Sequence, residues 1–298
     1  MTQKLTAALQ REMFNAVQTR MGPRSGLGAP VRDAFFQNDR GGAREYPLAR
    51  LLSSRKGTGG GGRGGKTRVA LYLSLIWVAS GGEHTSDRPA RFWAALLGLA
   101  DPDGAGSRVV RSTWRELEAR RLVAITPGDH SGATPVVRLL REDGSGEAYT
   151  IPDGSPGETY RRIPEFAWRR LFAEPDLTGA GLTMYLVAVR TAYRARQIDD
   201  LTFPSDYFRR EYGLGESTRK NGLRNLCRLG VLEPHLRRVD DFGDPSQRAR
   251  RRTTYDILEE YAPVQREHAA REEAAAPQPV PQSTSGTSEE MAPTDDPF

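Results

Sequence analysis

The chain has 298 residues, 37% of them hydrophobic, which is enough for about two domains, each with its own core. Its one cysteine, Cys227, excludes an intramolecular disulfide framework and a zinc site made of several cysteines. The sequence contains no apolar run of about 18 residues and no N-terminal secretory signal, so we expect a cytoplasmic protein without a membrane partner.

The net charge of +5 is distributed unevenly along the chain. Residues 1–66 carry 12 basic and 4 acidic side chains, residues 67–262 carry 29 and 27, and residues 263–298 carry 2 and 7. The sequence therefore divides into a basic arm, a nearly neutral body and an acidic tail. A basic arm most often meets an anionic polymer or surface.

The basic arm begins with a predicted amphipathic helix over residues 3–21. Its apolar stripe repeats every four residues and consists of Leu5, Leu9, Met13, Val17 and Met21. This stripe could serve self-association or could pack on the first domain, and the sequence favours neither. The rest of the arm, residues 22–66, is rich in Gly, Arg and Ser and predicts a mobile basic linker.

The first half of the body, residues 67–141, predicts three helices followed by two strands. We expect helices over 67–80 and 88–97, a third helix beginning at 107, and strands over 123–126 and 135–140. Ser107 is the expected N-cap of the third helix, whose inward face is Val110, Trp114 and Leu117. Residues 142–159, rich in Gly, Asp, Ser and Pro, then predict an interdomain linker.

The second half, residues 160–262, repeats this plan. We expect a short entry helix over 163–172, helices over 180–193, 204–212 and 216–229, and strands over 231–236 and 253–258. The composition of residues 263–298 predicts a disordered acidic tail.

Each half contains a helix with an apolar inner face, then a Leu-Val or Val-Leu pair that enters a strand and a hairpin. This pattern resembles the winged helix-turn-helix family of DNA-binding domains over residues 67–141 and 160–260. In that family three helices precede a two-stranded wing, and the third helix enters the major groove. The resemblance implies a mainly α fold with small β-hairpin wings: two tandem winged-helix domains, a flexible N-terminal arm and the acidic tail.

The outward face of each third helix is polar and mostly basic. The candidate DNA-contacting residues are Arg108, Arg111, Ser112 and Arg115 in the first half, and Ser217, Thr218, Arg219, Lys220, Asn221 and Arg224 in the second. Arginine can read guanine, asparagine can read adenine, and serine or threonine can bond to phosphates or bases. A solvated charged face is the alternative, but the recurrence of the pattern in both halves favours DNA contact.

The second predicted wing carries a basic run at its tip. Its candidate DNA-contacting residues are Arg248, Arg250, Arg251 and Arg252. Such a run can follow a phosphate backbone or place arginine in a narrow minor groove. It could equally be a solvated loop neutralised by its own acids. The first wing, around residues 128–133, has one charged side chain and is a weaker candidate.

These features predict a non-enzymatic protein that binds double-stranded DNA in the cytoplasm, on the nucleoid. The tandem arrangement is similar to that of plasmid replication initiators and is compatible with a transcription regulator. Because both domains follow the winged-helix plan, no ligand-sensing domain is left over, which favours the initiator. The alternative is a protein-interaction adaptor built from winged helices. The acidic tail is either a solubilising extension or a competitor of DNA for the basic arm.

Other chemistries find little support in the sequence. Residues 60–67 match the P-loop pattern, but no buried strand precedes them, so a nucleotide-binding protein is the weaker alternative. Asp241-Phe-Gly243 copies a kinase magnesium motif without its companion motifs. The four histidines show no i,i+4 pair. We therefore expect no catalytic residue, no metal, no cofactor and no small-molecule substrate.

Overall fold

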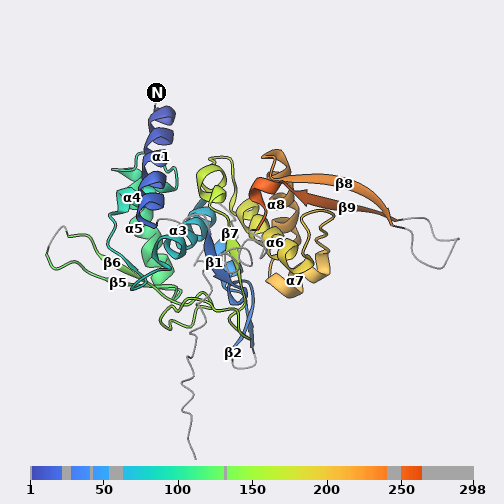
Figure 1. Cartoon of the computed structure of the whole chain (residues 1–298), viewed down its shortest axis with the longest axis horizontal. Coiled ribbons are helices and arrows are strands. Elements are labelled where there is room, and N and C mark those ends of the chain that lie inside the picture. Colours follow the sequence, from blue (N-terminus) through green and yellow to red (C-terminus); the bar gives the residue numbers. More distant parts are fainter. Residues whose placement is uncertain are drawn as a thin grey trace, which may run out of the picture. The chain divides into compact units, whose positions relative to one another are not determined.

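The computed structural model describes residues 2–21, 28–40, 43–53, 63–130, 133–239 and 250–263. They belong to one compact unit that the chain forms up to Val264. This unit combines helices with small antiparallel sheets, which confirms the expected mixture of helices and hairpins (Figure 1). None of the helices in the described ranges has the length and apolar character that a membrane span needs.

The first half contains three helices and a three-stranded antiparallel sheet. In chain order it comprises α3 (Arg63–Ala79), β4 (Thr85–Ser86), α4 (Ala90–Leu96), α5 (Ala105–Glu118), β5 (Val123–Thr126) and β6 (Val136–Leu139). The strand order in the sheet is β4-β6-β5. The three predicted helices and both predicted strands are confirmed, although α3 begins at Arg63 rather than at residue 67.

Helix α5 buries the predicted inner face, because Val110 and Leu117 are fully buried and Trp114 nearly so. The prediction that Ser107 is its N-cap is wrong. The carboxylate of Asp101 instead accepts hydrogen bonds from the backbone N–H groups of Gly104 at 3.2 Å and Ala105 at 2.7 Å. A side chain at the preceding turn thus satisfies the free amides at the helix start.

The second half has a closely similar order of elements. It comprises β7 (Tyr160–Ile163), the π-helical segment η3 (Ala167–Phe172), α6 (Gly179–Ala195), α7 (Ser205–Tyr212), α8 (Glu216–Arg228), β8 (Leu232–Val239), β9 (Arg250–Ile257) and the 3₁₀ turn η4 (Glu259–Tyr261). Leu201 bridges to Tyr255 of β9, as β4 pairs with β6 in the first half. The predicted entry helix is present as η3, but it begins at Ala167 rather than at Ile163, because residues 160–163 form a strand.

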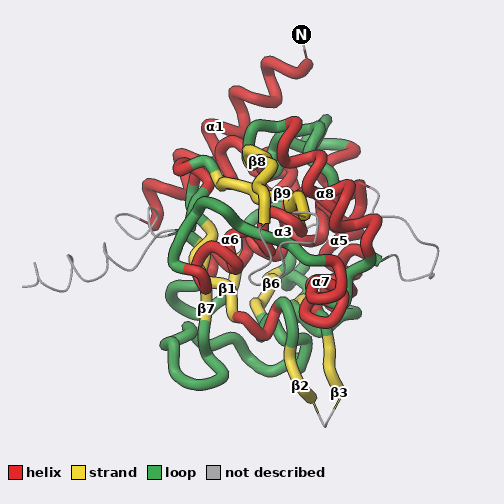
Figure 2. The backbone as a smooth tube through the Cα atoms, turned by 90° about the vertical axis from the view of Figure 1, so that its right-hand side faces the viewer, coloured by secondary structure: helices red, strands yellow, loops and turns green. Residues whose placement is uncertain are grey.

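The prediction of a mobile linker over residues 22–66 is wrong for the parts that the structure describes. Residues 28–53 contribute β1 (Ala29–Arg32), the 3₁₀ turn η2 (Asp33–Phe35), β2 (Asn38–Arg40), β3 (Ala43–Glu45) and α2 (Pro47–Leu52). Strand β1 pairs antiparallel with β7, and β2 pairs with β3 (Figure 2). The burial of Phe35, Phe36 and Leu51 in the core stabilises this segment.

Arg32 anchors this N-terminal segment to the predicted linker 142–159. It is fully buried, with Nη1 2.6 Å from a Glu142 carboxylate oxygen and Nε 2.6 Å from Glu158. Its guanidinium also lies 5.0 Å from the ring centre of Tyr149. Because Glu142 and Tyr149 are themselves buried, the segment between the halves is packed into the fold and is not a loose linker.

The two halves share one core. Trp77 of α3 stacks on Trp168 of η3 with ring centres 4.8 Å apart, and both side chains are fully buried. The indole Nε1 of Trp168 donates a 2.7 Å hydrogen bond to the Ser74 hydroxyl. Helix α3 also packs against α6. The predicted boundary between two domains therefore falls inside a single compact unit.

Helix α1 (Thr2–Met21) packs on its own chain, against α4 and η3. Val17 of its apolar stripe and the neighbouring Phe14 are buried, and the Phe14 ring centre lies 5.4 Å from that of Trp77. The Gln18 amide donates to Glu165 at 2.6 Å. The sequence left open whether this stripe serves self-association or packs on the first domain. The described side chains of the stripe pack within the chain. The predicted acidic tail, from residue 264 on, lies outside the described residues.

Candidate nucleic-acid interface

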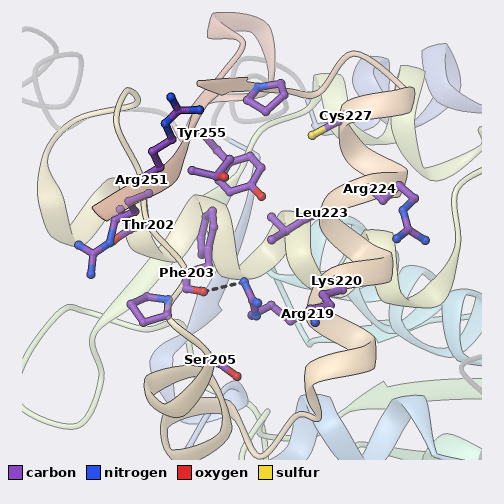
Figure 3. A pocket seen from close by; sticks show the side chains of 14 residues that line it. Thr202, Phe203, Ser205, Arg219, Lys220, Leu223, Arg224, Cys227, Arg251 and Tyr255 are labelled. Atoms are coloured by element: carbon purple, nitrogen blue, oxygen red, sulfur yellow. Dashed lines mark hydrogen bonds between the residues drawn. The ribbon is translucent and has the colours of Figure 1, made fainter. Parts of the chain in front are cut away.

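A cleft of about 660 Å³ lies in the second half, between helix α8 and the hairpin β8–β9. Fourteen residues line it, and they come from the start of α7 and the segment before it, from α8, and from the two strands (Figure 3). They are Thr202, Phe203, Pro204, Ser205, Arg219, Lys220, Leu223, Arg224, Cys227, Pro234, Arg251, Arg252, Thr253 and Tyr255.

The lining of this cleft is strongly cationic. Five of the residues are basic and none is acidic: α8 supplies Arg219, Lys220 and Arg224, and β9 supplies Arg251 and Arg252. The folded body is almost neutral, so this concentration of one sign is a local arrangement. A concave surface with one sign of charge raises the local concentration of oppositely charged ligands. The cleft therefore suits a polyanion.

The orientation of α8 is set by its inner face. Leu223 and Leu226 are buried, and a Cβ added at Gly222 would lie 2.4 Å from the backbone oxygen of Ala180 in α6. The buried Asn225 accepts from the backbone N–H of Thr178 at 2.9 Å. Close packing and this hydrogen bond hold the helix against the start of α6. The sequence pattern had not singled out Asn225.

The outer face of α8 is therefore presented to solvent. Ser217, Lys220, Asn221 and Arg224 are exposed, as the sequence predicted, and Thr218 is half-buried. Arg224 forms no ion pair with any residue in the described ranges. Lys220 lies 3.4 Å from a carboxylate oxygen of Glu216, yet its side chain remains 64% exposed. These side chains are free to contact a ligand.

Arg219 has a different environment from its neighbours. Its Nε and Nη2 donate to the carboxylate of Glu216 at 2.7 and 2.5 Å, and its Nη1 donates to the backbone oxygen of Phe203 at 2.9 Å (Figure 3). Hydrogen bonds from Arg219 and then Ser205 lower the pKa of Glu216 to about 2. Arg219 thus braces α8 against the segment before α7. Its predicted contact with DNA stays a prediction.

The wing contributes its cations from β9. Arg251 and Arg252 are exposed and line the cleft. Arg250 is the first residue of β9, and its side chain is not described. Arg248 lies outside the described residues, as does the rest of the hairpin tip over 240–249.

The first half presents a second basic face, on α5. Arg108, Arg111, Ser112 and Arg115 are all exposed, on the side of the helix away from Val110 and Leu117. Within the described part of the chain none of these arginines has an acidic partner. The acid of the next turn, Glu116, is engaged elsewhere, by Arg68 at 2.7 Å. Both third helices thus carry unneutralised cations on their outer faces.

The other chemistries considered from the sequence gain no site in the part of the chain that the structure describes, and the kinase-like motif at residues 241–243 lies outside that part. Lys66 of the P-loop-like pattern lies inside α3, where its Nζ donates to the backbone oxygen of Glu174. Residues 60–62 of the pattern lie outside the described residues, and the nearest described element before them is helix α2. Burial lowers the pKa of Lys66 to about 8. The described residues contain no cluster of three potential metal ligands. Cys227 lines the cleft half-buried, and burial raises the pKa of its thiol.

Comparison with protein-family models, curated proteins and solved structures finds no match to this chain. The functional argument therefore depends on the cleft and on the two basic helix faces.

Proposed function

We propose that this chain is a non-enzymatic protein that binds double-stranded DNA through two tandem winged-helix units. In each half, three helices are followed by an antiparallel hairpin, and a short strand or bridge before the second helix pairs with the hairpin's last strand. The observation that carries the proposal is the cleft between α8 and the wing, with five cations and no acid in its lining.

The chemistry of this surface matches what duplex DNA offers. The major groove, about 12 Å wide, admits one α-helix. Arg224 and Asn221 extend from the exposed face of α8 and can reach base edges, arginine towards guanine and asparagine towards adenine. Lys220, Arg251 and Arg252 surround that face and can neutralise phosphates. The exposed arginines of α5 give the first half an equivalent surface.

Within this class, a replication initiator or a transcription regulator is the proposed role, in the cytoplasm and on the nucleoid. Both halves of the described body are used by the two helix-and-wing units, which favours the initiator. A genome-wide map of binding sites separates the two roles. Repeated sites clustered at one origin support an initiator, whereas sites scattered over promoters support a regulator.

The direct test removes two cations from the cleft. In the double variant Lys220→Ala/Arg224→Ala, affinity for a duplex selected from a random pool should fall more than about tenfold at 0.15 M salt. If both side chains contact phosphates, the slope of log affinity against log salt should fall by about 2. Fluorescence anisotropy of the labelled duplex at several salt concentrations measures both quantities.

The matched control is Arg169→Ala/Arg170→Ala, which removes two exposed cations from η3, outside the cleft. It should bind almost as the unmodified chain does. The proposal is refuted if the unmodified chain binds no duplex even at about 50 mM salt, where phosphate contacts are strongest. Equal losses in the two double variants would show bulk attraction and would contradict a specific site in the cleft.

A further inference from the structure

The wing of the second half carries an apolar side chain that the charge argument leaves unexplained. Leu236 of β8 is 64% exposed, the highest fraction among the large exposed hydrophobic residues of the described chain. Single exposed leucines are common on protein surfaces, so exposure alone says little. The position of Leu236 on the hairpin is what gives it significance.

The register of the hairpin places Leu236 on the side that faces the cleft. In an antiparallel pair, directly opposed residues share one face of the sheet, and the face alternates along the strand. Leu232 and Ile257 are opposed and buried at the base of the wing; Pro234 and Tyr255 are opposed and line the cleft. The next pair on this face is Leu236 and Thr253, and Thr253 also lines the cleft.

The opposite face of the wing carries side chains that lie close to acidic residues. His235 lies 2.9 Å from Asp256, and Arg237 donates to Asp200 at 2.8 and 3.1 Å. Thr254 on the same face donates to Asp200 at 3.1 Å. On the outer face, Arg237 and Thr254 therefore bind an acid of the protein itself, although Arg252, opposed to Arg237, also lines the cleft. The cleft-facing side continues from Leu236 to the exposed Arg251.

We infer that Leu236 is an apolar DNA contact of the wing, which packs on the sugars and base edges of the groove beside the one that α8 enters. This inference rests on the proposed function and assigns a specific contact to it. Arg251, the next cleft-facing residue of β9, supplies the charge complementarity that brings a phosphate backbone to this surface. An apolar side chain next to such a cation loses contact with water when the backbone docks. Leucine is among the apolar residues that minor-groove-binding proteins insert between base steps.

The salt dependence of DNA binding distinguishes an apolar contact at Leu236 from a phosphate contact. A phosphate contact releases counterions, so its loss lowers the salt slope, whereas an apolar contact releases none. Leu236→Ala should therefore weaken binding to the selected duplex about 5- to 20-fold, as expected for loss of a partly buried leucine contact, with an unchanged salt slope. Leu236→Met keeps the apolar volume and should bind within about twofold of the unmodified chain.

The control is Ile151→Ala, which removes a comparably exposed aliphatic side chain, 56% exposed, outside the cleft. It should leave affinity unchanged. All variants are compared by anisotropy after circular dichroism has confirmed the same helical content. If Leu236→Ala binds as tightly as the unmodified chain while Lys220→Ala/Arg224→Ala loses binding, the inference is overturned and the proposed function stands. A lowered salt slope in Leu236→Ala also overturns it. If the unmodified chain binds no duplex, the proposed function itself fails.

Discussion

At the scale of single residues, burial determines what a cation can do. Arg32 and Arg219 are bound by carboxylates, whereas Lys66 is half-buried and its Nζ donates to a backbone oxygen, that of Glu174. Burial is the main cause that lowers the pKa of Lys66 to about 8. Since free lysine titrates near 10.4, the unfolded chain holds this proton more tightly than the folded chain does. The charge on Lys66 therefore costs stability at neutral pH.

Replacing this lysine should stabilise the protein. Lys66→Met is expected to raise the free energy of unfolding by about 1–3 kcal/mol at pH 7, because an apolar chain of similar length avoids burying an ammonium group. The cost of the charge is fully present below pH 8 and disappears as pH rises through 8 towards about 10.5. The gain should thus shrink at pH 10. Urea unfolding of both proteins at pH 7 and pH 10 tests this; a gain of equal size at the two values would contradict it.

At the scale of elements, helix α8 shows how far sequence reasoning reached. Its limits, its buried face and its exposed cations follow from hydrophobic periodicity. Periodicity also predicted α5 and the strands of both hairpins, but α5 begins at Ala105 rather than at residue 107, and β8 and β9 extend to Val239 and Arg250 rather than to residues 236 and 253. Periodicity did not predict that Arg219 braces α8 against the segment before α7. Its partner Glu216 is three residues earlier on the same helix, a spacing that favours an ion pair, so the signal was present in the sequence. Glu216 also lies in the first turn, where a negative charge is favourable.

The pairing within α8 leads to a prediction for DNA affinity. Glu216 stays ionised above about pH 2 and partly neutralises Arg219 and Lys220 at the edge of the cleft. Glu216→Gln keeps a hydrogen-bonding side chain and removes the charge, so duplex binding should strengthen about two- to fivefold at low salt, with a steeper salt slope. Glu259→Gln, the same charge change at an exposed residue of η4, is the control. Unchanged or weaker binding in Glu216→Gln would show that its charge does not limit the cleft.

At the scale of the whole molecule, sequence periodicity could not reveal how the halves are joined. Strand β1 pairs with β7, and Arg32 pairs with Glu142, across more than a hundred residues of chain. Local patterns carry no information about such partners, so a Gly- and Arg-rich segment with isolated aromatics was interpreted as a mobile arm. The buried Phe35 and Phe36 of that segment were the available clue. The basic arm is consequently in part a structural element, and Arg32 is not available to attract a polyanion.

The shared core predicts that the two halves unfold together. Trp168 of the second half stacks on Trp77 of the first and is fully buried, so Trp168→Ala should lower the free energy of unfolding by about 3–5 kcal/mol. Because β1–β7 pairing and the α3–α6 packing also cross between the halves, this loss should move a single transition rather than create a second one. Thermal unfolding followed by far-ultraviolet circular dichroism and by tryptophan fluorescence should give coincident curves in both proteins. Two separate transitions, with only one of them shifted by the substitution, would mean that each half is stable alone. The α5 and α8 faces would then be free to move independently, whereas a single transition means that they are carried by one folding unit.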